Sequence, residues 1–67
     1  MASPLEPIKE AIEGGTGVSA NKTGTGLWVV TADGWVDSVK FTARESGATV
    51  AEAAEKVMAQ INEIRGV

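Results

Sequence analysis

The chain has no cysteine and no histidine among its 67 residues. The missing cysteines exclude disulfides and thiolate chemistry, and the two absences together remove nearly every zinc or iron site. They also leave no imidazole that could activate a serine or threonine hydroxyl as a nucleophile. We therefore predict no metal, no cofactor, no catalytic residue and no enzymatic activity.

Long apolar runs and an excess of positive charge are also absent. No segment approaches the roughly 20 apolar residues that a membrane span needs, and the amino terminus has no basic stretch followed by an apolar run. We expect no membrane association and a cytoplasmic location, with which the lack of cysteine is compatible. The net charge of −3 disfavours nucleic acid as a partner, because binding to a phosphate backbone depends on lysine and arginine.

The length of the chain limits the number of domains and the size of the core. Sixty-seven residues predict one small domain spanning residues 1–67, and so short a chain buries only about 60% of its unfolded surface. A composition of 43% hydrophobic and 22% charged residues is typical of a folded chain. Small domains often compensate for a thin core with disulfides, metals or partners. Because the first two are excluded, self-association is the compensation that we expect.

The first third of the sequence predicts a short helix followed by a loop. Ser3 can cap a helix that starts at Pro4, and the pattern predicts helix over residues 4–13, weakened by Pro7 and ended by Gly14-Gly15. Residues 14–26 contain five glycines and little that could fill a core. We predict a flexible Gly/Thr-rich loop or linker there, with a brief edge strand at residues 18–20 as the less favoured alternative.

The middle of the sequence predicts a β-hairpin over residues 27–44. Leu27 begins the strongest run of β-forming residues, and Asp33-Gly34 supplies a turn in which glycine accepts positive φ. On the return strand, Phe41 and its odd-numbered neighbours are apolar, while the even-numbered residues are polar, so the odd positions should face the core. A bulge near residues 36–38 would reconcile this alternation with the turn.

The end of the chain predicts an amphipathic helix over residues 49–65. Thr49 and Glu52 form a capping box, and Gly66 is a plausible stop. The apolar side chains recur at helical spacing, at Val50, Ala53, Ala54, Val57, Ile61 and Ile64. The predicted fold class is α+β: a short N-terminal helix, a Gly/Thr-rich loop, a two-stranded antiparallel hairpin and a C-terminal helix packed on the hairpin.

The layout of these elements resembles one known family. A helix, a hairpin with an Asp-Gly turn at Asp33-Gly34, a return strand from Val39 to Ala43 and a closing helix together resemble the small head-to-tail joining proteins of tailed phages. The resemblance is one of layout and length. No site residue is transferred from it.

The first hairpin strand is apolar on both faces, and this pattern suggests a function. If Leu27 and Val29 face the C-terminal helix, Trp28 and Val30 face away from it, and one helix covers only one of the two faces. An exposed apolar face with tryptophan favours an interface. We predict a non-enzymatic protein-interaction or assembly module that binds itself or another protein. Its interaction surface would comprise Trp28, Val30, Trp35, Val57, Met58 and Ile61.

Two other functions fit the sequence less well. Trp28 and Trp35 with Lys40 and Arg44 could form an aromatic and basic surface that stacks single-stranded bases. Alternatively, a small ligand could bind between the subunits of an oligomer, since one copy is too small to enclose a pocket easily.

Overall fold

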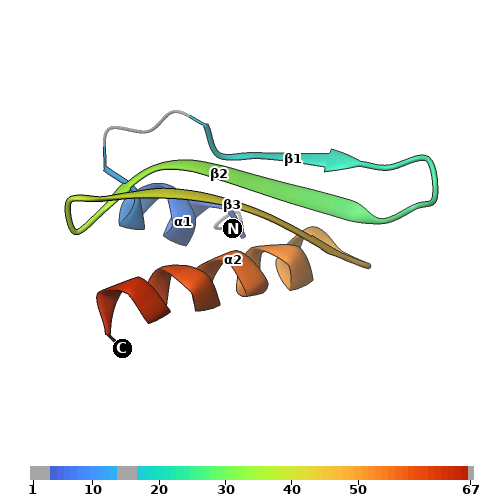
Figure 1. The fold of residues 1–67 in the computed structure, drawn as a ribbon. Helices are drawn as coiled ribbons and strands as arrows, with labels where there is room; N and C mark the ends of the chain where they lie inside the picture. Colours follow the sequence, from blue (N-terminus) through green and yellow to red (C-terminus); the bar gives the residue numbers. More distant parts are fainter. Residues whose placement is uncertain (1–3, 14–16, 67) are drawn as a thin grey trace.

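The computed structural model describes residues 4–13 and 17–66. Within them the fold is α+β, as predicted, but the antiparallel sheet has three strands in the order β1-β2-β3 rather than two. Both helices lie on the same side of this sheet (Figure 1). In chain order the elements are α1 (Glu6–Ala11), β1 (Ser19–Lys22), β2 (Trp28–Val36), β3 (Val39–Gly47) and α2 (Val50–Arg65).

The hairpin between β2 and β3 turns at Asp37 and Ser38. Their φ angles are both positive, at 48° and 67°, and Val36 pairs with Val39 across them. Two central residues with positive φ are typical of the two-residue turn whose twist matches that of the flanking strands. The predicted turn at Asp33-Gly34 is therefore wrong.

The Asp-Gly pair lies inside β2 because a later turn allows longer strands. With the turn at residues 37–38, β2 and β3 each contain nine residues. This arrangement buries Val36 and Phe41, which are 1% and 3% exposed. The gain in paired backbone and buried apolar surface outweighs the local turn preference of aspartate and glycine.

The pairing of β2 with β3 is regular along its whole length. It runs residue for residue from Val36 opposite Val39 to Trp28 opposite Gly47. The bulge predicted near residues 36–38 is therefore absent, and β3 continues three residues beyond the predicted end at Arg44. One turn thus fixes the register of the entire hairpin.

Strand β1 falls within the segment predicted to be a loop. Ser19–Lys22 pairs antiparallel with β2, with Ala20 opposite Val30 and Lys22 opposite Trp28. The less favoured edge-strand alternative was thus closer to the structure. A tight connection follows, in which the Thr23 N–H donates to the Leu27 carbonyl at 2.7 Å. Of the rest of the predicted loop, residues 14–16 lie outside the described residues.

The short N-terminal helix is confirmed, within the predicted span. Ile8 in α1 and Ile12 just after it are 0% and 6% exposed. Glu13 then forms two main-chain hydrogen bonds with Trp35 in β2, at 2.7 and 3.0 Å. These bonds hold the end of α1 to the sheet. The predicted cap Ser3 and stop Gly14-Gly15 lie outside the described residues.

The C-terminal helix is confirmed together with both of its predicted ends. The Glu52 N–H donates to the Thr49 hydroxyl at 3.1 Å, and the Glu52 carboxylate accepts from the Ala48 N–H at 3.3 Å. Gly66 ends the helix with φ of 74°. Gly47 permits the close approach of α2 to β3, because a Cβ there would lie 3.0 Å from the Ala53 nitrogen.

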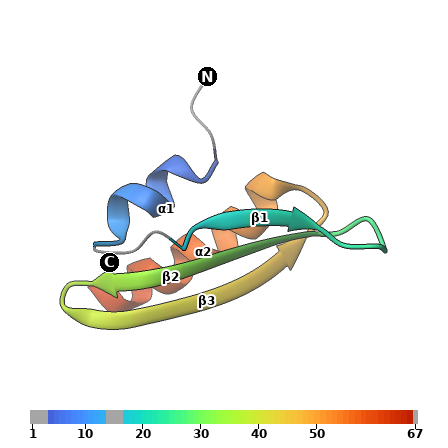
Figure 2. The same cartoon turned by 90° about the horizontal axis from the view of Figure 1, so that it is seen from above.

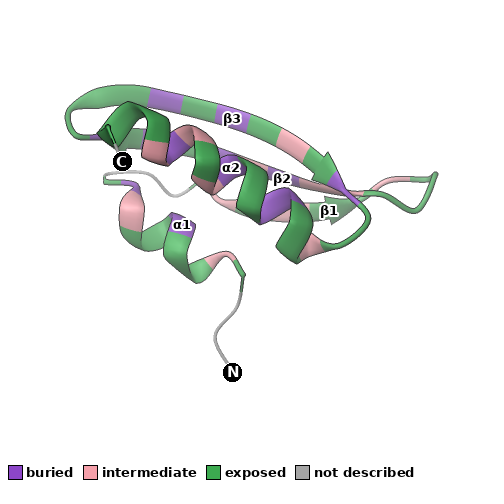
Figure 3. Cartoon of the chain, turned by 90° about the horizontal axis from the view of Figure 1, so that it is seen from below, coloured by how far each residue is buried: buried purple, intermediate pink, exposed green. Residues whose placement is uncertain are grey.

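The core lies between the sheet and the two helices. It contains no polar or charged residue among those that the structure describes. Figure 3 shows buried positions on α1, α2, β2 and β3. The buried hydrophobic residues of the described part of the chain are Ile8, Ile12, Val30, Ala32, Val36, Phe41, Ala43, Ala53, Ala54, Val57 and Ile61.

The turn generates a stability prediction. A non-glycine residue in the left-handed region costs about 1 kcal/mol, so Ser38→Gly should raise the free energy of unfolding by about 0.5–1 kcal/mol. Ser38→Ala, which keeps a Cβ at the same φ, should give no such gain. Urea unfolding followed by circular dichroism measures both. Equal stabilities of the two variants would contradict a turn at this position.

Candidate functional site

The register divides the side chains of the sheet between two faces. Residues directly opposite each other on paired strands share a face, and successive residues alternate. The helix face therefore carries the even-numbered residues of β2 and the odd-numbered residues of β3. The other side, the open face, carries Ser19, Asn21, Val29, Thr31, Asp33, Trp35, Lys40, Thr42, Arg44 and Ser46.

Three of the six predicted interaction residues lie in the core. Val30, Val57 and Ile61 each have 0% exposure. Val30 lies on the helix face, so the expectation that Val30 and Trp28 face away from α2 is wrong. Because the turn has two residues, the even-numbered residues of β2 lie on the same face of the sheet as Phe41 and Ala43. Val30 therefore lies under the helix.

The other three predicted residues are at least partly accessible, but they do not form one surface. Trp28 is half-buried on the helix face, opposite Gly47. Met58 is half-buried and packs against the edge of the core. Trp35 is 47% exposed on the open face. Whether these side chains take part in self-association stays a prediction.

The open face brings together Trp35, Lys40 and Arg44, three of the four residues of the nucleic-acid hypothesis. Trp35 lies directly opposite Lys40, and Arg44 lies opposite Thr31. The fourth residue, Trp28, lies on the helix face. Asp33 adds a carboxylate among these residues, where its Oδ1 accepts a hydrogen bond from the Thr42 hydroxyl at 3.2 Å.

Exposed apolar side chains gather at the turn end of the molecule. Trp35, Val39 and Ile64 are 47%, 51% and 37% exposed, and we call these three residues the tip surface. Figure 2 shows the hairpin turn and the C-terminal end of α2 at the same end, with the connection between β1 and β2 at the opposite end. That connection carries Leu27, which is 44% exposed.

Sequence reasoning missed Val39 and Ile64 as surface residues. Each belongs to an apolar pattern most of whose other members are buried, and the pattern therefore predicted that each lies in the core. Their position supplied a usable signal, because each lies within three residues of the end of its element. The last apolar residues of a strand or helix often extend beyond the layer that covers the others.

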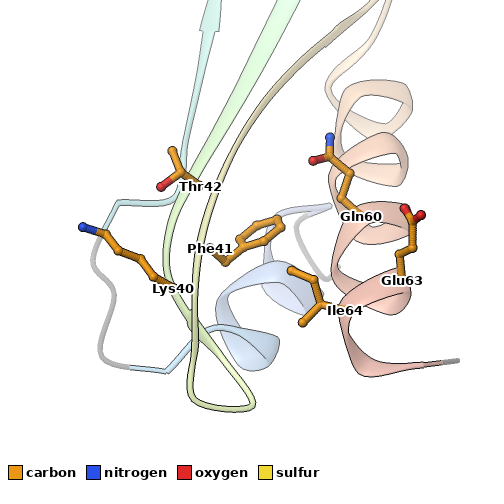
Figure 4. A pocket seen from close by; sticks show the side chains of 6 residues that line it. All are labelled: Lys40, Phe41, Thr42, Gln60, Glu63 and Ile64. Atoms are coloured by element: carbon orange, nitrogen blue, oxygen red, sulfur yellow. The ribbon is translucent and has the colours of Figure 1, made fainter.

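Two of the hollows on the surface of the described residues run along α2. The first, of about 340 Å³, lies between α2 and β3, where Phe41 points toward the helix and Lys40 and Thr42 lie on the other side of the strand (Figure 4). The second, of about 490 Å³, lies between α1 and α2 and is lined mostly by proline, alanine and Met58. Both are open grooves rather than enclosed cavities.

Residues 4–13 and 17–66 contain no group of three or more histidine, cysteine, aspartate or glutamate side chains that could hold a metal ion. None of the described helices is long and apolar enough to cross a membrane.

Comparison with known proteins gave no match: no family model fits the chain, no curated protein is significantly similar in sequence, and no solved structure is significantly similar. The resemblance in layout to head-to-tail joining proteins is also weakened. It included a hairpin turn at Asp33-Gly34, and the hairpin turns at Asp37 and Ser38 instead. The candidate site therefore depends on the geometry of this chain alone.

The burial of Ile61 and the exposure of Ile64 can be tested with a matched pair of variants. Ile61→Ala should lower the free energy of unfolding by about 2–5 kcal/mol, since it leaves a cavity in the core. Ile64→Ala should lower it by less than about 1 kcal/mol. Urea unfolding followed by tryptophan fluorescence measures both, and Ile61→Val provides a milder change if Ile61→Ala does not fold. Similar losses from both alanine variants would contradict the assignment.

Proposed function

We propose that the chain is a non-enzymatic protein-interaction module that self-associates through its tip surface. The observation that supports this proposal is the clustering of Trp35, Val39 and Ile64, each more than a third exposed, at one end of the molecule. By the register, Trp35 lies on the open face and Val39 on the helix face, so the tip surface extends around the end of the hairpin. Exposed apolar side chains grouped in this way favour a protein interface. A second copy would supply the burial that a chain of this length cannot provide alone.

The charges around the tip surface suit pairing with an identical copy. Asp37 lies in the turn, Lys40 is opposite Trp35, and Arg65 ends α2. Asp37 and Arg65 also line one shared depression. A two-fold interface must be complementary to itself, and a patch that carries both signs of charge can place each acid of one copy near a base of the other.

Size-exclusion chromatography with light scattering tests the proposal. The unchanged chain should give a mass that rises toward that of two chains with increasing concentration. Val39→Asp, which adds a charge to the tip surface without removing a core side chain, should remain a single chain at the same concentrations. Trp35→Ser should weaken the association in the same direction.

Leu27→Asp provides the matched control, because Leu27 is about as exposed as the tip residues but lies at the opposite end of the sheet. This variant should associate as the unchanged chain does. The proposal is wrong if the unchanged chain has the mass of one copy throughout, or if Leu27→Asp and Val39→Asp have equal effects.

A second candidate function, binding of single-stranded nucleic acid, is favoured by one observation. Trp35, Lys40 and Arg44 share the open face, so a base could stack on the indole while the two cations contact phosphates. The carboxylate of Asp33 on that face and the net charge of −3 oppose such binding. We therefore rank it below protein interaction.

Titration with oligothymidylate tests this candidate. In a Trp28→Phe variant, binding should quench the fluorescence of Trp35. With two cations on the face, the logarithm of the affinity should fall with the logarithm of salt concentration with a slope of about −1.4. Arg44→Gln should reduce this slope by about half. The absence of quenching, or quenching that salt does not change, would rule the candidate out.

A further inference from the structure

The outer edge of β3 is unpaired in the described part of the chain, since β3 is the last strand of the sheet. Trp35 forms main-chain hydrogen bonds with Glu13 through both its N–H and its carbonyl. The pair of Trp35 with Lys40 is therefore a non-hydrogen-bonded pair of the β2–β3 ladder. Because such pairs alternate along an antiparallel ladder, the main-chain groups of Lys40, Thr42, Arg44 and Ser46 point toward the free edge.

One end of this edge is already covered. The Lys56 ammonium donates to the Ser46 carbonyl at 2.8 Å, and the Gln60 side chain donates to the Glu45 carboxylate. These contacts hold α2 against the C-terminal end of β3. The edge from Lys40 to Arg44 remains available, with three residues whose N–H and carbonyl groups point outward.

A groove runs beside the available part of the edge. Phe41 and Ile64 contribute its apolar lining, with Gln60 and Glu63 on the helix side, and its volume is about 340 Å³ (Figure 4). An extended segment that pairs with a sheet edge directs alternate side chains to opposite faces. Half of its side chains would therefore enter this groove, and the other half would continue the open face.

The charges on the edge determine which segment fits. Lys40 and Arg44 both lie on the open face of β3 and are both exposed. Antiparallel pairing of two copies of β3 centred on Thr42 would place Lys40 opposite Arg44 of the other copy, and a centre at Arg44 would place two arginines opposite each other. Like charges opposite one another destabilise a sheet, and edge lysines prevent self-pairing.

We infer that the edge of β3 from Lys40 to Arg44 binds an extended acidic segment of another protein as an added strand. Acidic side chains of the segment lie opposite Lys40 and Arg44, and apolar side chains between them enter the groove beside Phe41. Main-chain hydrogen bonds to Lys40, Thr42 and Arg44 supply a sequence-independent part of the affinity. This site adjoins the tip surface proposed for self-association and shares Ile64 with it, but its main-chain hydrogen bonds use the edge of β3, which the tip surface does not.

The probe is the peptide acetyl-Ser-Glu-Val-Thr-Leu-Glu-Ser-amide, whose two glutamates match Arg44 and Lys40 in an antiparallel register. It is titrated into the ¹⁵N-labelled full chain, and the titration is repeated on Val39→Asp so that the result does not depend on self-association. Binding should shift the amide resonances of Lys40, Thr42 and Arg44 and slow their hydrogen exchange. The same peptide with glutamine in place of glutamate should bind about tenfold more weakly.

A matched pair of variants separates strand addition from simple charge attraction. Thr42→Pro removes an N–H that points to the free edge, where proline is tolerated, and should weaken binding of the peptide at least about tenfold. Thr42→Val removes the same hydroxyl but keeps the N–H, and should bind within about twofold of the unchanged chain. A dispersed amide spectrum confirms that both variants are folded.

Three results would overturn the inference. The first is equal weakening by Thr42→Pro and Thr42→Val, which would show that the outward N–H is not used. The second is an absence of peptide-induced shifts along β3, which would exclude this site whether or not the chain self-associates. The third is displacement of the peptide by oligothymidylate at lower concentration, which would assign Lys40 and Arg44 to nucleic acid.

Discussion

The register of β2 against β3 is the constraint on which the rest of the structure depends. Asp37 and Ser38 set it by turning in two residues, both with positive φ. The register decides on which face of the sheet each side chain lies, and the features described below follow from that assignment. It places Val30 and Phe41 under the helices and Trp35 on the open face. It also decides which main-chain groups of β3 bond to β2 and which point toward the free edge.

Helix α2 is held to one strand of the sheet by polar contacts as well as by the core. Near its beginning, Gly47 allows close approach, and Lys56 donates to the Ser46 carbonyl at 2.8 Å. Farther along, Gln60 donates to the Glu45 carboxylate. Beyond Gln60 the described residues of α2 form no such hydrogen bond with β3. The groove beside Phe41 therefore opens at the C-terminal part of the helix, next to the hairpin turn.

Local signals predicted well the features that local chemistry controls. The cap at Thr49 and the stop at Gly66 depend on neighbouring residues, and both are confirmed. The hairpin turn and β1 depend on pairing between distant residues, and they were predicted wrongly. The residues of β1 are serine, alanine, asparagine and lysine, which have no apolar alternation, so only their pairing with β2 makes them a strand. The sequence suggested a surface of Trp28, Trp35, Lys40 and Arg44, but only the register shows that Trp28 lies on the opposite face from the other three.

The free edge and the tip surface lie side by side but differ in charge, and this difference separates what each can bind. The edge presents Lys40 and Arg44 on one face, so a second copy of β3 meets repulsion there in the antiparallel registers centred on Thr42 or Arg44. The tip surface is bordered by both acidic and basic side chains and meets no such barrier. The charged edge therefore opposes the addition of a second copy of β3 to the sheet. The tip surface carries no such obstacle to self-association. Val39 and Lys40 are neighbours in sequence, but in a strand their side chains point to opposite faces, so a substitution at one leaves the other in place for the two proposed interactions to be tested apart.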